Sequence, residues 1–369
     1  MANFAKILKD IGYDVVLFTD IFSPEITEKI RFLKFFNVYS LGTLRPAIKI
    51  KIGTRRFLEL PRVDILIKLL RKEKVDTIML FSGHYLVPML KKMLPSLKII
   101  LYVFFPYFLA YSFSIKETYY QQRKLSRVVL KEYEKQIYSH ADLIITISEY
   151  SRKILELTMN VQSYVIHEPI DTNFFKPSWE KKMYGLVISI SQFMPSKRQD
   201  IMIQLFKKLM SLVKNKKDEL TLVLAGGLNP YYIDYAKNIL RSKYGASNLK
   251  ILLNPSDEVV LDLYQRAYIY WHLHEEHHIL TPLEAMACGT PAVLMKYGGI
   301  DGAVHRYNSM LANNYDEFVK YTIELIEDTS LWKKLAINAY RSVQYFSLER
   351  TRHRLEKLLI KELNISPTI

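Results

Sequence analysis

Short apolar runs, rich in β-branched residues, alternate with longer amphipathic stretches along the whole chain, and this alternation restricts the fold more than any other feature. In the first half, the apolar runs occupy residues 14–19, 76–82, 98–105 and 141–148. Stretches with helical periodicity lie between them, including residues 62–74 and 117–140. Strands that alternate with helices form parallel sheets with helices on both faces. The sequence therefore predicts an α/β protein with doubly wound sheets.

The same alternation starts again after residues 168–177. The apolar runs of the second half occupy residues 185–191, 220–226, 249–254, 267–273 and 290–296. A chain of 369 residues also suits two domains better than a single core. We therefore expect two doubly wound domains joined near residues 169–180. Ligands bind outside the carboxyl ends of the strands in such sheets, so a cleft between the two domains is the expected site.

Composition places the chain among folded proteins, since 49% of its residues are apolar and 24% are charged. Cys288 is the single cysteine, so no internal disulfide can form. It lies in an apolar run, where a small buried filler is expected rather than a nucleophile. No charged and then apolar signal segment precedes the first helix-like stretch. These features predict a cytoplasmic protein.

The formal net charge is +15, and residues 1–176 contribute +10 of it, with 27 basic and 17 acidic side chains. Nucleic acid, anionic lipid headgroups and phosphorylated substrates all fit a basic surface, and so does a merely soluble, lysine-rich one. No recognised nucleic-acid-binding motif accompanies the charge, so nucleic acid is not an expected partner. An anionic membrane surface stays open as a partner of the basic first half.

Residues 99–115 carry no charge, which raises the question of a membrane span. A spanning helix needs about 20 apolar residues, whereas this run is shorter and has Pro106 in its middle. We interpret residues 99–105 as a buried parallel strand and residues 106–113 as an aromatic loop at its carboxyl end. Internal packing of this loop is favoured, and contact with a lipid is the alternative.

Residues 274–278, His-Glu-Glu-His-His, satisfy the zinc-binding pattern H-E-x-x-H, which needs a helix through both histidines. Thr281 and Pro282 follow, and Thr281 with Glu284 has the spacing of a capping box, so the helix is expected to begin after the histidines. We therefore expect no metal site. A loop with Glu276, followed by a helix N-terminus with Glu284, instead outlines a sugar-phosphate site, because helix amides suit phosphate and carboxylates suit sugar hydroxyls.

Residues 275–300 resemble the E-x7-E segment of retaining glycosyltransferases of family GT4, which have the GT-B fold of two Rossmann-like domains that face each other across a cleft. Glu276 and Glu284 match its two glutamates, and A-M-A-C-G-T-P at 285–291 and the turn at 298–299 match the residues that follow. Further segments that resemble the family, in order and spacing, are residues 141–155, 165–177, 188–209 and 346–359. Together the matches cover most of residues 140–360.

The resemblance implies three parts of the chain. Residues 1–170 would form an acceptor-side domain, residues 171–345 a nucleotide-sugar donor domain, and residues 346–369 a C-terminal helix that returns to the first domain. The implied activity is the transfer of a hexose from a GDP- or UDP-linked sugar to a lipid-linked or other glycan acceptor. It would retain the anomeric configuration and need neither metal nor cofactor.

The segment S-Q-F-M-P-S-K at residues 191–197 is most similar to the branch that includes the mannosyltransferase extending lipid-linked oligosaccharide. This similarity makes mannose the first candidate for the transferred sugar. A lipid-phosphate acceptor would also explain the basic first half and the aromatic loop. A peripheral protein at the cytoplasmic face of a membrane is therefore a hypothesis that stands beside a purely cytoplasmic one.

The resemblance also assigns roles to individual residues of the second domain. Lys197 would bind the donor diphosphate and stabilise the negative charge that grows on it as its bond to the sugar breaks. Gln192 stands where many members have Arg, so it can donate a hydrogen bond there but no charge. Glu276 would contact the transferred sugar and form the catalytic pair with Lys197, whereas Glu284 would hold the ribose hydroxyls. Backbone amides for the diphosphate would come from Ile279, Leu280 and Thr281.

Two departures from the family pattern keep a second hypothesis open. Phe104 stands where the related branch has a histidine near the reacting sugar, and His84 is the nearest acceptor-side candidate to replace it. The chain also begins inside the helix that follows the first strand of the family, so the first sheet is expected without that strand. The alternative function is a catalytically inactive GT-B protein that binds sugar nucleotides.

Overall fold

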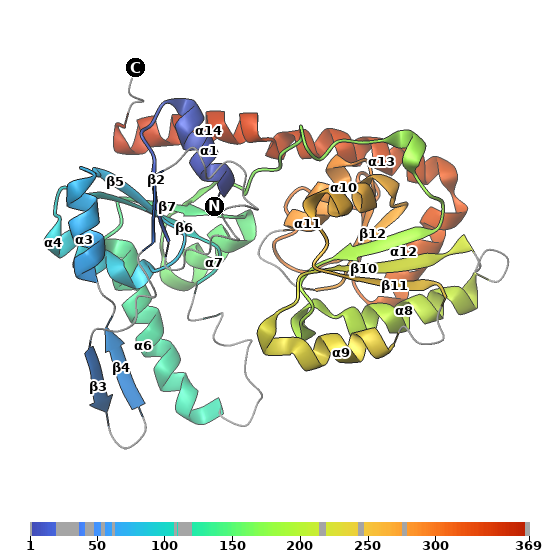
Figure 1. The fold of residues 1–369 in the computed structure, drawn as a ribbon, viewed down its shortest axis with the longest axis horizontal. Coiled ribbons are helices and arrows are strands. Elements are labelled where there is room, and N and C mark those ends of the chain that lie inside the picture. The colour runs from blue at the N-terminus through green and yellow to red at the C-terminus, as the bar shows by residue number, and fades with distance from the viewer. Residues whose placement is uncertain are drawn as a thin grey trace. The chain divides into compact units, whose positions relative to one another are not determined.

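The computed structural model describes residues 2–19, 37–40, 48–52, 56–60, 63–106, 109, 120–213, 219–242, 247–274 and 279–365. The chain divides into two compact units (Figure 1). Unit 1 comprises Met1–Glu168 and Thr351–Ile369, and unit 2 comprises Pro169–Arg350. The division after Glu168 lies close to residue 170, where the family resemblance placed the boundary, and to the junction near residues 169–180 that the sequence pattern predicted.

Unit 1 contains a four-stranded parallel sheet in the order β5-β6-β7-β8. Its strands span Thr77–Leu80 (β5), Lys98–Val103 (β6), Leu143–Thr146 (β7) and Tyr164–Val165 (β8). All residues of β6 from Ile99 to Val103 are buried, as expected of a parallel strand covered on both faces. The first three strands confirm the runs predicted at 76–82, 98–105 and 141–148.

Two smaller pairs of strands also belong to unit 1. β1 (Val16–Thr19) pairs in parallel with β2 (Asn37–Ser40), and β3 (Ile48–Ile52) pairs antiparallel with β4 (Arg56–Leu60). The hairpin of β3 and β4 was not predicted, although Ile-Lys-Ile-Lys-Ile in β3 alternates with the period of two that a strand has.

The helices of unit 1 are α1 (Ala2–Ile11), α3 (Val63–Lys72), α4 (Val87–Met93), α6 (Tyr120–Ser139) and α7 (Glu149–Met159). Aromatic packing attaches α1, because the ring centroid of Phe4 lies 4.9 Å from that of Tyr102 in β6 and 5.5 Å from that of Phe81. Among the residues that the structure describes, no helix is long and apolar enough to cross a bilayer. Most of the predicted aromatic loop at 106–113 lies outside the described residues.

The last helix, α14 (Leu348–Leu363), begins in unit 2 and belongs to unit 1 from Thr351 onward. Its C-terminal end is held in unit 1 by two side chains. The Lys98 ammonium donates a hydrogen bond to the carbonyl of Leu363 (2.7 Å), and the Tyr13 hydroxyl donates one to the carbonyl of Ile365 (3.1 Å).

Unit 2 contains a six-stranded parallel sheet in the order β11-β10-β9-β12-β13-β14. Its strands span Leu186–Ile190 (β9), Thr221–Gly226 (β10), Leu249–Leu253 (β11), Ile269–His272 (β12), Ala292–Met295 (β13) and Ser309–Ala312 (β14). β9 lies beside β12, although β10 and β11 come between them in the chain. The chain thus winds outward in both directions from the β9–β12 pair, and such a switch point is where open α/β sheets bind ligands.

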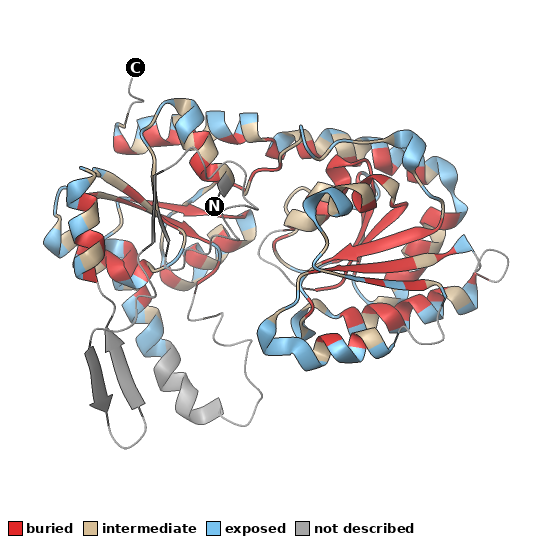
Figure 2. Ribbon diagram, viewed as in Figure 1, coloured by how far each residue is buried: buried red, intermediate tan, exposed pale blue. Residues whose placement is uncertain are grey.

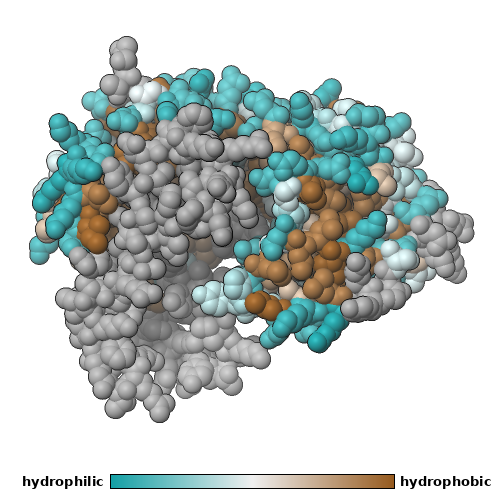
Figure 3. All heavy atoms as spheres, viewed as in Figure 1, coloured by the Kyte–Doolittle hydropathy of each residue, from teal (hydrophilic) through white to brown (hydrophobic). Residues whose placement is uncertain are grey.

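Helices cover both faces of this sheet (Figure 2). They are α8 (Gln199–Leu212), α9 (Ile233–Arg241), α10 (Asp257–Arg266), α11 (Leu280–Ala287), α12 (Tyr315–Glu327) and α13 (Thr329–Val343). Alternate residues of a strand point to opposite faces, so Trp271 of β12 packs in one apolar cluster and its neighbour Tyr270 in another. In Figure 3, hydrophilic residues lie mainly along the outer edge of unit 2, and hydrophobic residues gather in the middle of this face, where Figure 1 draws the strands of the sheet.

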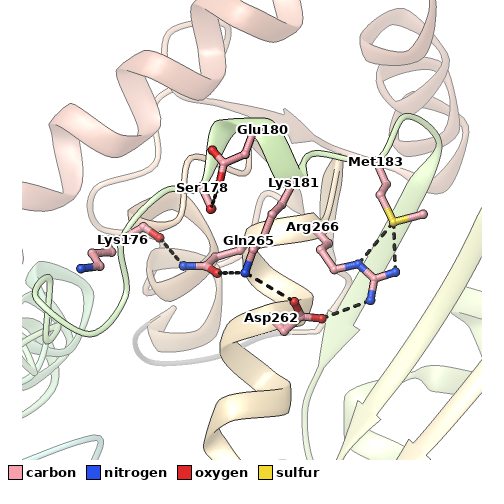
Figure 4. A network of polar contacts seen from close by, with 8 residues as sticks. All are labelled: Lys176, Ser178, Glu180, Lys181, Met183, Asp262, Gln265 and Arg266. Carbon is pink, nitrogen blue, oxygen red and sulfur yellow. Dashed lines mark hydrogen bonds and ion pairs between the residues drawn. The ribbon is translucent and has the colours of Figure 1, made fainter.

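Polar contacts fasten the segment that enters unit 2, residues 176–183, to the end of α10 (Figure 4). Gln265 donates a hydrogen bond to the carbonyl of Lys176 (3.0 Å) and accepts one from the ammonium group of Lys181 (3.2 Å). The guanidinium group of Arg266 lies 3.1 Å from the sulfur of Met183 and 3.1 Å from a carboxylate oxygen of Asp262. These contacts fix the entry segment beside α10, the helix that carries Tyr264.

Candidate functional site

The carboxyl ends of β9 and β12 bring together residues predicted for the second domain. These strands pair in parallel, with Ile188 opposite Tyr270, so their carboxyl ends lie at the same edge of the sheet. The loop with Gln192 and Lys197 leaves β9 at this edge, and the segment that leads to α11 leaves β12 there. The candidate site therefore lies at the switch point of the unit 2 sheet.

The loop after β9 is held by Gln199 and by a close approach to β10. Buried Gln199 donates hydrogen bonds from Nε2 to Ser191 Oγ (3.0 Å) and to the carbonyl of Gln192 (2.8 Å). Gly226, at the end of β10, has φ +152°, and a Cβ there would lie 1.9 Å from the Ser191 carbonyl oxygen. The backbone of the loop is thus fixed, whereas the Gln192 side chain is exposed at its surface.

Lys197 ends a short 3-10 turn, Pro195–Lys197, directly before α8. Burial of its side chain lowers the pKa of the ammonium group to about 8. Lys197 is still mainly protonated at pH 7, and its partial burial reduces the screening of its charge by water. An anion beside it would replace the solvation that burial removes. These properties fit the anion-binding role predicted for Lys197.

Two buried histidines, His272 and His274, interact electrostatically with Lys197. Their ring centroids lie 3.9 Å apart, and the two residues are 1% and 4% exposed. Burial, followed by the charge of Lys197, lowers the pKa of His272 to about 3. Burial also lowers the pKa of His274, with smaller contributions from His272 and Lys197. Both rings are therefore neutral at physiological pH, and Lys197 provides the positive charge of this cluster.

Helix α11 begins at Leu280, with buried Ile279 as its N-cap residue. The first amides of a helix have no acceptor within the helix and point out of its N-terminus, where the helix dipole also favours an anion. The start of α11 is thus formed by the residues predicted to offer amides to a diphosphate: Ile279, Leu280 and Thr281. A Cβ at Ile279 packs inward, because the residue is completely buried.

The predicted capping box is wrong. Thr281 is the second residue of α11 rather than its N-cap, and no side chain caps the helix. Thr281 Oγ1 instead lies 2.8 Å from the hydroxyl of Tyr270, and Glu284 Oε2 accepts a hydrogen bond from the hydroxyl of Tyr264 at 2.9 Å. Both side chains therefore contact the hydroxyls of buried tyrosines, Tyr270 of β12 and Tyr264 of α10, rather than the first amides of α11.

Like Tyr264 and Tyr270, Lys182 was not predicted, and it contacts Tyr264 and Thr290. Its ammonium group donates hydrogen bonds to the carbonyl of Tyr264 (3.1 Å) and to the hydroxyl of Thr290. Burial lowers the pKa of Lys182 to about 7. Lys182, Tyr264 and Tyr270 lie in amphipathic or apolar stretches, where no spacing or motif separates them from ordinary packing residues.

Glu276 lies outside the described residues, together with the rest of residues 275–278, so its contact with the transferred sugar stays a prediction. α11 begins after His278, which confirms that the H-E-x-x-H pattern precedes the helix rather than lying in it. Among the residues that the structure describes, no group of three His, Cys, Asp or Glu side chains could hold a metal ion.

The acceptor-side candidates, His84 and Phe104, belong to unit 1. His84 is 3% exposed, its Nε2 lies 3.2 Å from the carbonyl oxygen of Leu80, and burial lowers its pKa to about 4. Phe104 follows β6, is 36% exposed, and packs edge-on against Tyr102 with 5.4 Å between ring centroids. Phe104 thus offers an exposed surface, whereas His84 is neutral and enclosed. The acceptor-side role of each stays a prediction.

Solved structures with the same architecture define the class of protein. The structure of Anabaena HepE in complex with UDP aligns over 98% of this chain and 96% of that chain, with a TM-score of 0.74 and 16% identity. Sucrose-phosphate synthase from Thermosynechococcus elongatus aligns over 98% of this chain and 92% of that chain, with a TM-score of 0.76 and 15% identity. The chain has the GT-B fold, and this confirms the predicted fold class.

Two family models match consecutive parts of the chain. Glycosyltransferase Family 4 matches residues 1–174, and Glycosyl transferases group 1 matches residues 171–342. Because the two models together match nearly the whole chain, the protein belongs to the GT4 family of group 1 glycosyltransferases, as the E-x7-E resemblance indicated.

Similar proteins from other organisms carry related names. An uncharacterized glycosyltransferase from Methanocaldococcus jannaschii is 24% identical over 58% of this chain and 57% of its own length. A D-inositol 3-phosphate glycosyltransferase from Salinispora arenicola is 29% identical over 45% of this chain and 39% of its own length. The alpha-1,3/1,6-mannosyltransferase ALG2 of Candida albicans is 23% identical over 90% of this chain and 85% of its own length. The chain thus spans about half the length of the first two relatives and most of the third.

Proposed function

We propose that the protein is a retaining glycosyltransferase that moves a hexose from a nucleotide-sugar to a lipid-linked or other glycan acceptor. Unit 2 binds the donor. One observation carries the proposal: Lys197, the N-terminus of α11 and Glu284 belong to the segments that leave β9 and β12 at the switch point of the unit 2 sheet. Family membership supports it, because the group 1 model matches residues 171–342, which contain these residues, and the family resemblance implies a donor-binding role for them.

The chemistry needs charge stabilisation more than acid catalysis. A bond forms between an acceptor hydroxyl oxygen and the anomeric carbon, the bond from that carbon to the diphosphate breaks, and the hydroxyl proton leaves with the nucleoside diphosphate. Lys197 and the first amides of α11 stabilise the negative charge that develops on the leaving oxygen. Lys197 is mainly protonated at pH 7 and supplies positive charge, so we propose that the reaction needs no metal and no further cofactor.

Mannose is the first candidate for the hexose, with GDP as the nucleotide, because the relative that aligns over 90% of this chain is named as a mannosyltransferase. A UDP-linked sugar is the second candidate, because HepE was solved in complex with UDP and with UDP-glucose. The two nucleotides differ in the base, and the proposal is tested with both.

Unit 1 binds the acceptor, and its positive charge favours a phosphorylated lipid at an anionic membrane surface. Sedimentation with liposomes tests this part separately. Anionic vesicles are expected to pull down more protein than neutral ones, and increasing salt is expected to abolish the difference. Equal sedimentation with both kinds of vesicle would remove the membrane from the proposal and leave a soluble glycan as the acceptor.

The second candidate function is a GT-B protein that binds sugar nucleotides without turnover. One observation favours it: exposed Phe104 stands where the related branch has a histidine near the reacting sugar, and a phenyl ring cannot hydrogen-bond a hydroxyl. Turnover of GDP-mannose or of any UDP-sugar in the presence of an acceptor would exclude this candidate.

Calorimetric titration of GDP, UDP and their sugar conjugates in the presence of a chelator tests the donor site first. Saturable binding of one nucleotide is expected, and Lys197→Ala is expected to weaken it about tenfold or more. Lys208→Ala is the matched control, because Lys208 lies on α8 and pairs with Asp316, away from the switch point. Binding by none of these nucleotides, or equal binding by wild type and Lys197→Ala, would refute the proposed donor site.

A further inference from the structure

Tyr264 of α10 is directed at the carboxylate of Glu284 from inside the protein. The residue is completely buried, and its hydroxyl donates a hydrogen bond of 2.9 Å to Glu284 Oε2. Its ring is enclosed by Phe175 and Tyr270, with ring centroids 5.8 and 6.0 Å away. A side chain packed in this way has one position, so its hydroxyl is a fixed donor for the glutamate.

Tyr270 of β12 makes an equivalent link to the first turn of α11. Its hydroxyl accepts the N–H of Ile190 (3.2 Å) and lies 3.0 Å from the Ile190 carbonyl oxygen and 2.8 Å from Thr281 Oγ1. Ile190 is the last residue of β9. One buried hydroxyl therefore ties the end of β9, where the Lys197 loop begins, to the N-terminus of α11.

Both hydroxyls keep their protons throughout the physiological range. Burial and the nearby Glu284 raise the pKa of Tyr264 well above 10, and burial raises that of Tyr270. Glu284 has three rotatable bonds, so an unsupported carboxylate would lose side-chain entropy on binding a ligand. The bond from Tyr264 holds Glu284 Oε2 in advance, in an apolar surrounding where such a bond is strong.

We propose that Tyr264 and Tyr270 are positioning residues of the donor site with separable effects: Tyr264 orients Glu284 toward the ribose hydroxyls, and Tyr270 sets the first turn of α11 against the diphosphate. This inference rests on the proposed function, which assigns the ribose to Glu284 and the diphosphate to α11. Neither tyrosine touches the donor, because both are completely buried.

The test compares nucleotides that differ only in the ribose. Dissociation constants of GDP and UDP and of their 2′,3′-dideoxy analogues are measured for wild type, Tyr264→Phe and Tyr270→Phe. Phenylalanine keeps the packed ring and removes the hydroxyl. Tyr264→Phe is expected to weaken the ribonucleotide about fivefold to tenfold and the dideoxy analogue less than twofold. Tyr270→Phe is expected to weaken both by the same factor.

Two controls separate positioning from general damage. Tyr184→Phe removes a hydroxyl that donates to the Ile326 carbonyl (3.0 Å) in the other apolar cluster of unit 2, and it is expected to change neither constant. The second control combines Tyr264→Phe with Glu284→Gln. Because Glu284→Gln already removes the carboxylate, adding Tyr264→Phe is expected to leave the ratio of the ribonucleotide and dideoxynucleotide dissociation constants unchanged. Thermal melts verify folding, and the titrations are repeated at a lower temperature if Tyr264→Phe melts below the assay temperature.

The outcomes distinguish the two levels of the argument. Equal losses for ribo- and dideoxynucleotide in Tyr264→Phe would overturn the positioning role and leave the donor site intact. An unchanged ribonucleotide affinity in Tyr264→Phe would overturn it in the same way. If wild type bound neither nucleotide, the proposed function would fail, and this inference would fail with it.

Discussion

Raising the pH from 7 to 9 is expected to weaken the binding of a nucleoside diphosphate about tenfold, because Lys197 loses its proton in this window. Burial lowers the pKa of Lys197 to about 8 in the unliganded protein, so the protonated fraction falls from about nine-tenths at pH 7 to about one-tenth at pH 9. A bound diphosphate raises this pKa, and binding at pH 8 therefore takes up about half a proton. His272 and His274 do not titrate in this window, because their pKa values are lowered far below it.

Calorimetry in two buffers of different ionisation enthalpy measures both quantities. The diphosphate itself is almost fully ionised above pH 7, so a change of affinity between pH 7 and 9 belongs to the protein. Lys197→Arg is the matched variant, because a guanidinium keeps its charge throughout and should give flat affinity and no proton uptake. A wild type with constant affinity from pH 7 to 9, and no proton uptake at pH 8, would refute the assignment of the diphosphate to Lys197.

Three further variants are expected to change affinity or stability. Gln192→Arg restores the cation of the family pattern and should tighten diphosphate binding about fivefold, an effect that high salt should reduce in titrations. Lys182 has its pKa lowered from 10.5 to about 7, so between these values the unfolded chain binds a proton that the folded protein does not, and stability rises with pH. Lys182→Met should therefore raise the free energy of unfolding more at pH 6 than at pH 10, and the two gains should differ by about 4 kcal/mol. Denaturant unfolding at the two pH values measures this difference, and an equal gain at both would contradict the burial argument. Gly226→Ala would place a Cβ 1.9 Å from the Ser191 carbonyl oxygen and should cost about 3 kcal/mol or more, visible as a lower melting temperature; an unchanged melt would show that the loop can shift.

Much of the architecture could be predicted because it depends on local pattern. The run at 185–191 became β9 at Leu186–Ile190, and the run at 220–226 became β10 at Thr221–Gly226. Parallel strands buried on both faces are continuous apolar stretches, and these stand out between polar helices. The hairpin of β3 and β4 escaped prediction, since each strand is short and carries two charges, Lys49 and Lys51 in β3 and Arg56 and Glu59 in β4.

Residues of the candidate site could be predicted only where they belong to a recognisable family motif. Glu284 and the start of α11 were predicted from the E-x7-E segment, which has a fixed spacing, and Lys197 was predicted from the resemblance of residues 188–209 to the family. The capping-box prediction failed for a physical reason. A capping box would bond the side chains of Thr281 and Glu284 to nearby backbone amides, but in the fold they contact the hydroxyls of buried tyrosines from β12 and α10. Such partners lie 11 and 20 residues away along the chain, and no periodicity marks them.

The path of the C-terminal helix has a consequence for the order in which the protein is made. Unit 2 is continuous in sequence, whereas unit 1 consists of Met1–Glu168 and a tail from Thr351. On the ribosome, unit 2 is complete before the last segment of unit 1 has been synthesised. Until then the groups that receive that tail, Lys98 and Tyr13 among them, stay exposed to solvent. A nascent chain that lacks the tail should therefore lack these two hydrogen bonds, and its earlier half should gain further protease resistance once the tail has been made.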